Sequence, residues 1–254
     1  MNLQPYLEFA TSLAYHAGKI TLRYFNTGVV PDRKENNDPV TIADREAEAF
    51  VRAEVEKHYP GHAIVGEEYG ENGNGHAFRW IVDPIDGTIS FVQGVPLYGV
   101  LIALEIEGIV KVGAAYFPPL DEMLTAGDGL GCWWNGRRAR VSSVNKLSEA
   151  CVVTSDFQHL SAKMNDIVPR FERKNALLRT WGDAYGYLLV ATGRAEVALD
   201  PRMDVYDCGP YPVIMQEAGG FFGSWDGTEG HTHGEGLACN AALKPEVLKL
   251  MRGS

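Results

Sequence analysis

The sequence predicts a mixed fold, with an α+β part followed by an α/β part. Two strand-like segments joined at Gly108, and further short strands up to residue 141, predict an antiparallel sheet. Beyond residue 145, short strands alternate with helices, which is the pattern of an α/β arrangement. A chain of 254 residues can bury a large core in either one domain or two.

The first part of the chain predicts two helices and a short strand. Residues 32–38 are polar and predict a loop or a hairpin. Thr41 is a plausible cap for a helix that includes residues 43–51, and Pro60-Gly61 would end it. Residues 63–65 predict a strand. A long amphipathic helix at the N-terminus is predicted by apolar residues at helical spacing: Leu3, Leu7, Ala10, Leu13, Ala14, Ala17 and Ile20.

The middle of the chain predicts mostly strands. Residues 70–76 are rich in glycine and asparagine and predict a flexible surface loop, whereas residues 79–82 predict a buried strand. Residues 99–107 and 109–117 predict a hairpin with its turn at Gly108. The antiparallel sheet is predicted to continue through residues 124–126, 127–135 and 137–141.

A change of pattern at residues 142–145 predicts a boundary between two parts of the chain. The N-terminal part, residues 1–143, would be α+β, and the C-terminal part, residues 144–254, would be α/β. In the C-terminal part we expect strands at 151–154 and 196–199 and helices at 184–192 and 207–218.

Composition and charge exclude several classes of function. A net charge of −10 argues against a surface for nucleic acid or for an anionic membrane. The four cysteines form no Cys-x-x-Cys pair, so we expect reduced thiols in a cytoplasmic protein instead of a zinc site or a disulfide framework. We expect no secretory signal, and the longest apolar stretch, residues 95–104, is too short to span a bilayer.

The most informative motif is the segment Asp-Pro-Ile-Asp-Gly-Thr at residues 83–88, which follows the apolar run Trp80-Ile81-Val82. It places Asp83 and Asp86 three positions apart on a turn that proline stiffens. Such hard oxygen ligands suit Mg²⁺, and small residues with free backbone N–H groups suit a phosphate. Taken alone, Asp-Pro-x-Asp-Gly is more typical of a surface turn.

Acidic residues elsewhere complete a possible constellation. Asp44 lies at a helix start, Glu67 at a strand end, and Asp207 at the opening of a helix. If the fold brings Glu67 and Asp207 to the two aspartates of the turn, the four carboxylates would repel one another strongly. Two or three Mg²⁺ ions would neutralise them, and this is the cofactor that we predict.

In order and spacing, these segments resemble the inositol monophosphatase superfamily of Mg²⁺-dependent, lithium-sensitive phosphatases. The resemblance runs from Asp38 to Gly220 and includes the turn at 83–88 and the segment Glu-Ala-Gly-Gly at 217–220. It implies a sugar-phosphatase fold, a layered αβαβα sandwich with the site between its two parts. It also implies a small phosphorylated metabolite as substrate and, commonly, a homodimer.

The resemblance assigns metal ligands residue by residue. Glu67, Asp83 and the backbone carbonyl of Ile85 would hold a first metal ion. Asp83, Asp86 and Asp207 would hold a second, and Glu67 could also support a weaker third.

The same resemblance assigns the phosphate contacts and the catalytic residues. Backbone N–H groups of Gly87 and Thr88 would bind the phosphate. Asp44 would pair with the Thr88 hydroxyl and help to activate the attacking water. For an isolated aspartate early in a helix, a favourable interaction with the helix dipole is the structural alternative.

For the substrate, the resemblance implies that Asp200, seven residues before Asp207, helps to hold the alcohol part, and Asp183 is a neighbouring polar position. Two acids there favour a cationic alcohol over a neutral polyol. The segments around them resemble the histidinol-phosphate phosphatase branch, whose substrate carries an ammonium group and an imidazole that these acids could bind. The sequence departs from that branch at Asp204 and Tyr206. An inositol monophosphatase or broad polyol-phosphate phosphatase is the alternative, and a catalytically silent metal-binding protein is a third reading.

Overall fold

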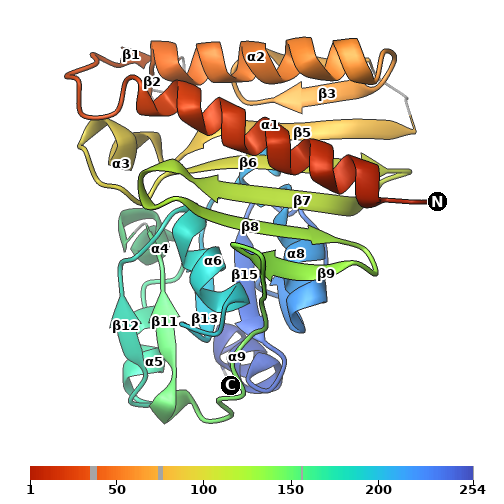
Figure 1. The fold of residues 1–254 in the computed structure, drawn as a ribbon. Helices are drawn as coiled ribbons and strands as arrows, with labels where there is room; N and C mark the ends of the chain where they lie inside the picture. Colours follow the sequence, from red (N-terminus) through yellow and green to blue (C-terminus); the bar gives the residue numbers. More distant parts are fainter. Residues whose placement is uncertain (35–38, 74–76, 156, 254) are drawn as a thin grey trace.

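The computed structural model describes residues 1–34, 39–73, 77–155 and 157–253. Its helices and sheets stack in five layers, in the order α, β, α, β, α (Figure 1). An eight-stranded sheet has the strand order β10-β9-β8-β7-β6-β5-β3-β4, and a five-stranded sheet has the order β12-β11-β13-β15-β14. A small sheet pairs β1 with β2.

The eight-stranded sheet is antiparallel except where β3 runs parallel to β5. β5 and β6 are its central long strands, and they bring the turn at 83–88 to one end of the sheet. The strands are β3 (Ala63–Gly66), β4 (Gly70–Asn72), β5 (Phe78–Asp86), β6 (Gly99–Ile106), β7 (Ile109–Phe117), β8 (Glu122–Gly127), β9 (Gly131–Trp134) and β10 (Arg137–Arg138).

In the five-stranded sheet, β11 runs parallel to both β12 and β13, and β15 is antiparallel to β13 and β14. The strands are β11 (Cys151–Val153), β12 (Leu177–Arg179), β13 (Val197–Asp200), β14 (Gly220–Gly223) and β15 (Gly236–Asn240), and the small sheet consists of β1 (Asp32–Arg33) and β2 (Pro39–Val40). The first large sheet lies within residues 63–138 and the second within 151–240. The boundary at residue 143 stays a prediction.

The longer α-helices form the three other layers. They are α1 (Gln4–Leu22), α2 (Ile42–His58), α3 (Thr88–Val92), α4 (Phe157–Lys163), α5 (Ile167–Glu172), α6 (Ala184–Ala191), α7 (Val205–Cys208), α8 (Tyr211–Ala218) and α9 (Lys244–Met251). Among the described residues, no helix is both long and apolar enough to cross a bilayer. The four cysteines are free thiols.

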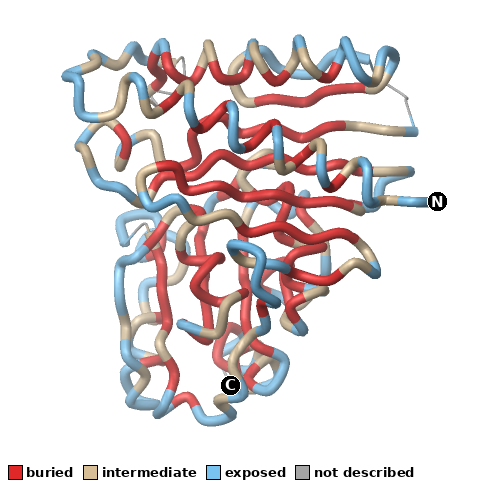
Figure 2. The backbone as a smooth tube through the Cα atoms, viewed as in Figure 1, coloured by how far each residue is buried: buried red, intermediate tan, exposed pale blue. Residues whose placement is uncertain are grey.

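The alternation of side chains along each strand explains the layers. Trp80 and Val82 of β5 pack with α1 and α2, whereas Ile81 between them packs on the opposite side with α6 and α8. In β13, Ala198 faces α6 and α8, and Leu199 faces the outer layer of α4, α5 and α9. The inner strands of both sheets are therefore buried on both faces, as the red strands of Figure 2 show.

The structure confirms most of the predicted elements, including the long N-terminal helix and the hairpin that turns at Gly108. The prediction of one helix over 207–218 is wrong, because the chain forms α7 and α8 with Gly209 and Pro210 between them. Pro210 has no N–H to continue the helix. A Cβ at Gly209 would lie 2.9 Å from the Ile81 side chain, so glycine permits the close approach of α7 to β5.

The predicted surface loop at 70–76 is wrong for its first residues. Gly70–Asn72 forms β4, which pairs antiparallel with β3. Glycine and asparagine have low strand propensity, but the open edge of β3 supplies hydrogen-bond partners that override it. Residues 74–76 lie outside the described residues. For residues 32–38, where a loop or a hairpin is expected, the antiparallel pairing of β1 with β2 favours the hairpin, and residues 35–38 likewise lie outside the described ones.

Candidate metal centre and substrate pocket

The pairing of β3 with β5 brings Glu67 to Asp83. These strands are parallel, and Gly66 is in register with Val82. The residues that follow them therefore emerge side by side at the same end of the sheet, and the Glu67 N–H donates to the Val82 carbonyl at 3.3 Å. Two acids that are 16 positions apart in sequence become neighbours.

The turn after β5 orients the next residues. The backbone N–H of Ile85 donates to Asp83 Oδ1 at 3.0 Å, and the β5–β6 register shifts between Asp83 and Asp86. Gly87 has a φ of 84°, and a Cβ there would lie 2.8 Å from Asp183 Oδ2. Glycine is therefore required both by the backbone and by the close approach of Asp183.

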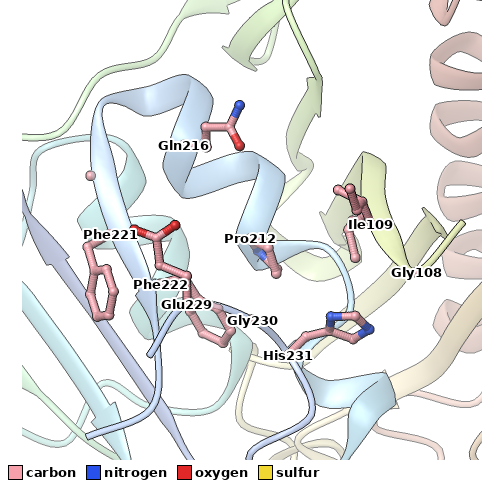
Figure 3. Close-up of a pocket in the computed structure, with 11 residues that line it drawn as sticks. Gly108, Ile109, Pro212, Gln216, Phe221, Phe222, Glu229, Gly230 and His231 are labelled. Carbon is pink, nitrogen blue, oxygen red and sulfur yellow. The ribbon is translucent and has the colours of Figure 1, made fainter. Parts of the chain in front are cut away.

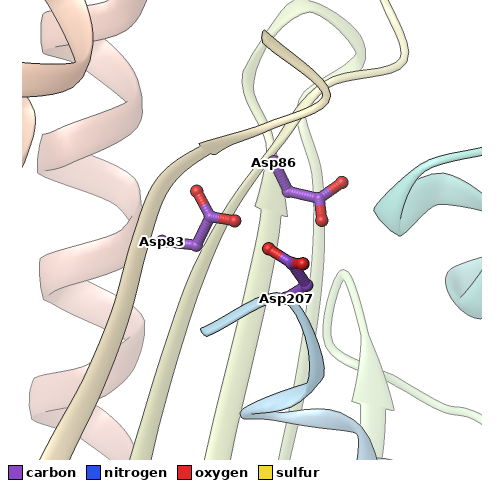
Figure 4. A group of neighbouring side chains, drawn as sticks. All are labelled: Asp83, Asp86 and Asp207. Atoms are coloured by element: carbon purple, nitrogen blue, oxygen red, sulfur yellow. The ribbon is translucent and has the colours of Figure 1, made fainter. Parts of the chain in front are cut away.

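Three carboxylates converge where β5 meets α7. Ligand oxygens of Asp83, Asp86 and Asp207 lie within 4.8 Å of one another, and Figure 4 shows all three pointing toward one region. Asp207 is in the first turn of α7, where the Asp204 N–H donates to its Oδ2 at 2.7 Å. The N–H of Ala184, at the start of α6, donates to Asp86 Oδ1 at 2.6 Å. Backbone N–H groups thus fix the cluster from two helices.

The electrostatics of this cluster favour a cation. Burial, and then the negative charges of Glu67, Asp86 and Asp207, raise the pKa of Asp83 well above its usual value. Burial and Asp207 likewise raise the pKa of Asp86, and burial raises the pKa of Asp207 to about 7. Within the described part of the chain, no basic nitrogen lies within 4.0 Å of these three carboxylates. Hard oxygen donors with uncompensated charge fit a divalent cation.

Glu67 is beside the cluster but is paired with Lys34. The Lys34 ammonium lies 2.6 Å from Glu67 Oε1 and 2.7 Å from Glu68 Oε1. Burial lowers the pKa of Lys34, but these two carboxylates outweigh it and the pKa is raised. Burial raises the pKa of Glu68 to about 7. Sequence reasoning missed Lys34, because it lies in a polar run that predicts only a loop or a hairpin.

Asp44 caps helix α2 with one carboxylate oxygen and faces the Thr88 hydroxyl with the other. It completes the capping box of α2, in which the Thr41 N–H and hydroxyl donate to its Oδ2 at 2.8 and 2.6 Å. Its other oxygen, Oδ1, lies 3.5 Å from the Thr88 hydroxyl, which is closer to the Ile85 carbonyl, at 3.1 Å. Burial raises the pKa of Asp44 to about 6, although the Thr41 donors oppose the shift. A buried carboxylate thus faces the Thr88 hydroxyl.

Two small cavities flank Gly87 and Asp183, which line both of them. One has a volume of about 170 Å³ and is lined by Pro39, Glu67, Gly87, Thr88, Ile89 and Asp183. The other has a volume of about 160 Å³ and is lined by Asp86, Gly87, Ser155, Asp183, Tyr187, Asp200, Arg202, Met203 and Asp207. The site therefore has one compartment beside Glu67 and Thr88 and another beside the predicted substrate residues.

Asp183 and Asp200 both reach the second compartment. Asp183 precedes α6 with φ 51° and ψ −157°, a conformation that a residue with a side chain rarely adopts, and accepts a hydrogen bond from the Ser90 hydroxyl at 2.8 Å. Asp200 is buried at the end of β13. Arg202 also lines this compartment, and sequence reasoning missed it because nothing marks an arginine in a loop as a pocket residue.

A larger cavity, of about 380 Å³, lies elsewhere and shares no lining residue with these two (Figure 3). It lies between the β6–β7 turn, α8, β14 and the loop that contains Glu229 and His231. His231 Nε2 is 3.1 Å from Glu105 Oε2. With Glu229 as the single carboxylate among its described lining residues, this cavity lacks the donor set of the metal centre.

A model of the inositol monophosphatase family matches residues 2–253. This chain belongs to the inositol monophosphatase family. Similar members include a histidinol-phosphatase of Chlorobaculum parvum, 42% identical over 92% of each chain, and one of Mycobacterium tuberculosis, 34% identical over 95% of this chain and 96% of the other. The solved structure of an IMPase from Thermotoga maritima matches with a TM-score of 0.90 at 29% identity, over 98% of this chain and 97% of that one. The predicted family and its layered fold are confirmed.

The acidic cluster predicts that a divalent cation stabilises this family member in a pH-dependent way. Carboxyl groups with a raised pKa keep protons in the folded protein that the unfolded chain has lost, so the metal-free protein loses stability from about pH 4 to about pH 7. A cation binds only the deprotonated cluster. At pH 8, Mg²⁺ at about 100 times its dissociation constant should add about 2.7 kcal/mol to the free energy of unfolding, or about 5–10 °C in Tm. At pH 5 the same concentration should have little effect.

Differential scanning fluorimetry with and without Mg²⁺ across this pH range measures the effect. Asp207→Asn removes one of the three carboxylates and should abolish most of the shift at pH 8. Glu149→Gln, an exposed acid outside the site, is the matched control and should keep the shift. An equal shift at pH 5 and pH 8, or in Asp207→Asn, would contradict a cation site at this cluster.

Proposed function

We propose that this chain is a Mg²⁺-dependent phosphatase that hydrolyses L-histidinol phosphate to L-histidinol and phosphate, a step of histidine biosynthesis. The observation that carries the choice of substrate is the pair of carboxylates, Asp183 and Asp200, in the compartment that adjoins Asp86 and Asp207. A leaving alcohol in that compartment meets negative charge, which favours a cationic alcohol. The names of the two histidinol-phosphatase relatives support the same substrate.

In this proposal, Glu67, Asp83 and the Ile85 carbonyl hold one Mg²⁺, and Asp83, Asp86 and Asp207 hold a second. Glu67 also supports a weaker third ion. The convergence of three of these carboxylates supports the assignment, and Glu67 would have to exchange Lys34 for a metal ion. When bound, Mg²⁺ would lower the pKa of a coordinated water and offset the negative charge of the phosphate.

The protein's own residues bind the phosphate and position the attacking water. Gly87 and Thr88 present backbone N–H groups at the first turn of α3, beside the cluster, and these would bind phosphate oxygens. Asp44 faces the Thr88 hydroxyl from a buried position. If the hydroxyl turns from the Ile85 carbonyl to Asp44, it can accept a hydrogen bond from the water and pass polarisation to the carboxylate.

Asp183 and Asp200 act on the other side of the scissile bond. The ammonium group and the imidazole of histidinol would each meet a carboxylate in the second compartment, whereas inositol would offer only hydroxyls. Arg202, at the same compartment, is a cation that the substrate's positive groups would have to avoid. Recognition therefore depends on where the two acids point and not on overall charge alone.

The finer expectations of the family resemblance belong to the same proposal. We infer inhibition by lithium, assembly as a homodimer, and a cytoplasmic location with a small phosphorylated metabolite as the partner. The acidic net charge supports the absence of a nucleic-acid partner.

The choice of substrate is tested by comparing L-histidinol phosphate with myo-inositol 1-phosphate in the presence of Mg²⁺. We expect kcat/KM to be at least about tenfold higher for histidinol phosphate, or about 1.4 kcal/mol. Equal values would remove the histidinol assignment and favour a broad polyol phosphatase. No hydrolysis of either ester would overturn the phosphatase assignment and favour a silent metal-binding protein.

The strained backbone and the charge of Asp183 predict that replacing it with glycine raises stability and lowers selectivity for the substrate. Asp183→Gly removes a backbone strain of about 1–3 kcal/mol and a negative charge near Asp86, at the loss of about 1 kcal/mol from the Ser90 hydrogen bond. We expect a higher Tm and a loss of preference for histidinol phosphate of about tenfold. Asp183→Asn, which keeps the strain and removes the charge, should lose selectivity with a smaller gain in Tm. Retained selectivity in both variants would contradict the role of Asp183.

The pairing of Asp44 with Thr88 predicts a loss of turnover without a loss of metal. Asp44→Asn keeps an acceptor for the Thr41 N–H in the capping box but removes the negative charge near the Thr88 hydroxyl. We expect kcat to fall by about 10²–10⁴ while the Mg²⁺-dependent rise in Tm persists, and Thr88→Ala should behave similarly. Steady-state kinetics and fluorimetry measure the two effects. An unchanged kcat in Asp44→Asn would remove Asp44 from the mechanism.

A further inference from the structure

We infer that Tyr187 is a positioning residue that, together with Ser155, holds the Asp200 carboxylate in the geometry that selects a cationic leaving group. The inference rests on the proposed function and deepens it. Sequence reasoning assigned Tyr187 no role, because it lies in an apolar helical run that is typical of a core. Only the folded structure brings Tyr187 and Ser155 to Asp200.

Three donors converge on Asp200. Ser155 donates its N–H and its hydroxyl to Oδ1 at 3.1 and 2.6 Å, and the Tyr187 hydroxyl donates to Oδ2 at 2.9 Å. Asp200 ends β13 and Ser155 follows β11, so the parallel pairing of these strands places both at one end of the sheet. Each carboxylate oxygen thus has a fixed donor, and the rotation of the group is set from both sides.

Tyr187 is itself rigid. It is fully buried, and its ring stacks on Tyr211 with centroids 4.5 Å apart and contacts Phe222 edge-on at 5.7 Å. It lies one turn after Asp183, on the face of α6 that meets the second compartment. Its hydroxyl is also 3.0 Å from Met203 Sδ. The donor therefore has little freedom to follow Asp200 if that side chain moves.

The arrangement has a consequence for recognition. Ser155 and Tyr187 donate to the two carboxylate oxygens of Asp200 from opposite sides. Donated hydrogen bonds favour the charged form of a buried carboxylate, and Asp200 lines the compartment in which the alcohol would lie. A substrate cation gains from a charged acceptor held at one place, whereas a neutral hydroxyl gains much less. Tyr187 would therefore affect binding of a cationic alcohol and have no direct effect on the phosphate side of the site.

The test is Tyr187→Phe, which keeps the ring and its stacking but removes the donor. We expect KM for L-histidinol phosphate to rise about tenfold and kcat to change by less than about twofold. The inhibition constant of myo-inositol 1-phosphate, a neutral-alcohol ester, should change by less than about twofold. The matched control is Tyr116→Phe, because the hydroxyl of the buried Tyr116 donates to Asp121 Oδ1 at 2.8 Å, and neither residue lines the two compartments.

If Tyr187 had a merely structural role, Tyr187→Phe would lower Tm and would change the KM of histidinol phosphate and the inhibition constant of myo-inositol 1-phosphate by similar factors, or it would have the same effects as Tyr116→Phe. Either result would overturn the inference. If Tyr187→Phe does not fold, Ser155→Ala decides, because it removes one donor from Oδ1 and keeps the backbone donor. Its KM for histidinol phosphate should rise in the same direction, and an unchanged KM would overturn the inference. If the wild-type protein does not prefer histidinol phosphate, the proposed substrate fails independently of these variants.

Discussion

The repulsion among Asp83, Asp86 and Asp207 is the constraint on which the site depends. These carboxylates are forced together by elements that are themselves fixed by apolar packing, because β5 is buried on both faces and α7 packs closely on it through Gly209. Folding therefore keeps in place an arrangement that is electrostatically unfavourable without a cation. The hydrophobic layers make that arrangement possible, and the uncompensated charge of the cluster favours a cation.

The negative charge of the site is compensated in two different ways. At the edge near Glu67, a lysine of the chain itself supplies the positive charge, since Lys34 bridges Glu67 and Glu68. At the centre, no described basic side chain does so, and the pKa values of the aspartates rise instead. The difference follows from access, because the ammonium reaches a partly buried acid from a neighbouring loop but does not reach the interior of the cluster. The cluster at the centre is therefore the candidate site for a cation from solution.

The sequence predicted what local pattern and a known motif can supply, namely the long N-terminal helix, the hairpin at Gly108 and the turn at 83–88. It predicted the convergence of acids only through family resemblance, because no local pattern reveals that β3 runs parallel to β5. It missed the break between α7 and α8 at Gly209, although the following residue, Pro210, has no N–H with which to continue a helix. It also missed Lys34 and Tyr187, whose partners are 33 and 13 positions away and are set by tertiary packing alone.

Helix α6 connects the carboxylate cluster with the compartment that Asp183 and Asp200 line. The N–H of its first residue, Ala184, donates to Asp86 in the carboxylate cluster. Asp183 directly precedes the helix, and Tyr187 in its first turn donates to Asp200. A movement of this helix would therefore disturb both Asp86, a predicted cation ligand, and the acids predicted to bind the substrate. Its rigid seat, formed by the ring stack with Tyr211 and by the two sheets on either side, explains how a strained residue such as Asp183 is tolerated. Under the proposed function, selection of the alcohol and binding of the metal would therefore be coupled through this one short helix.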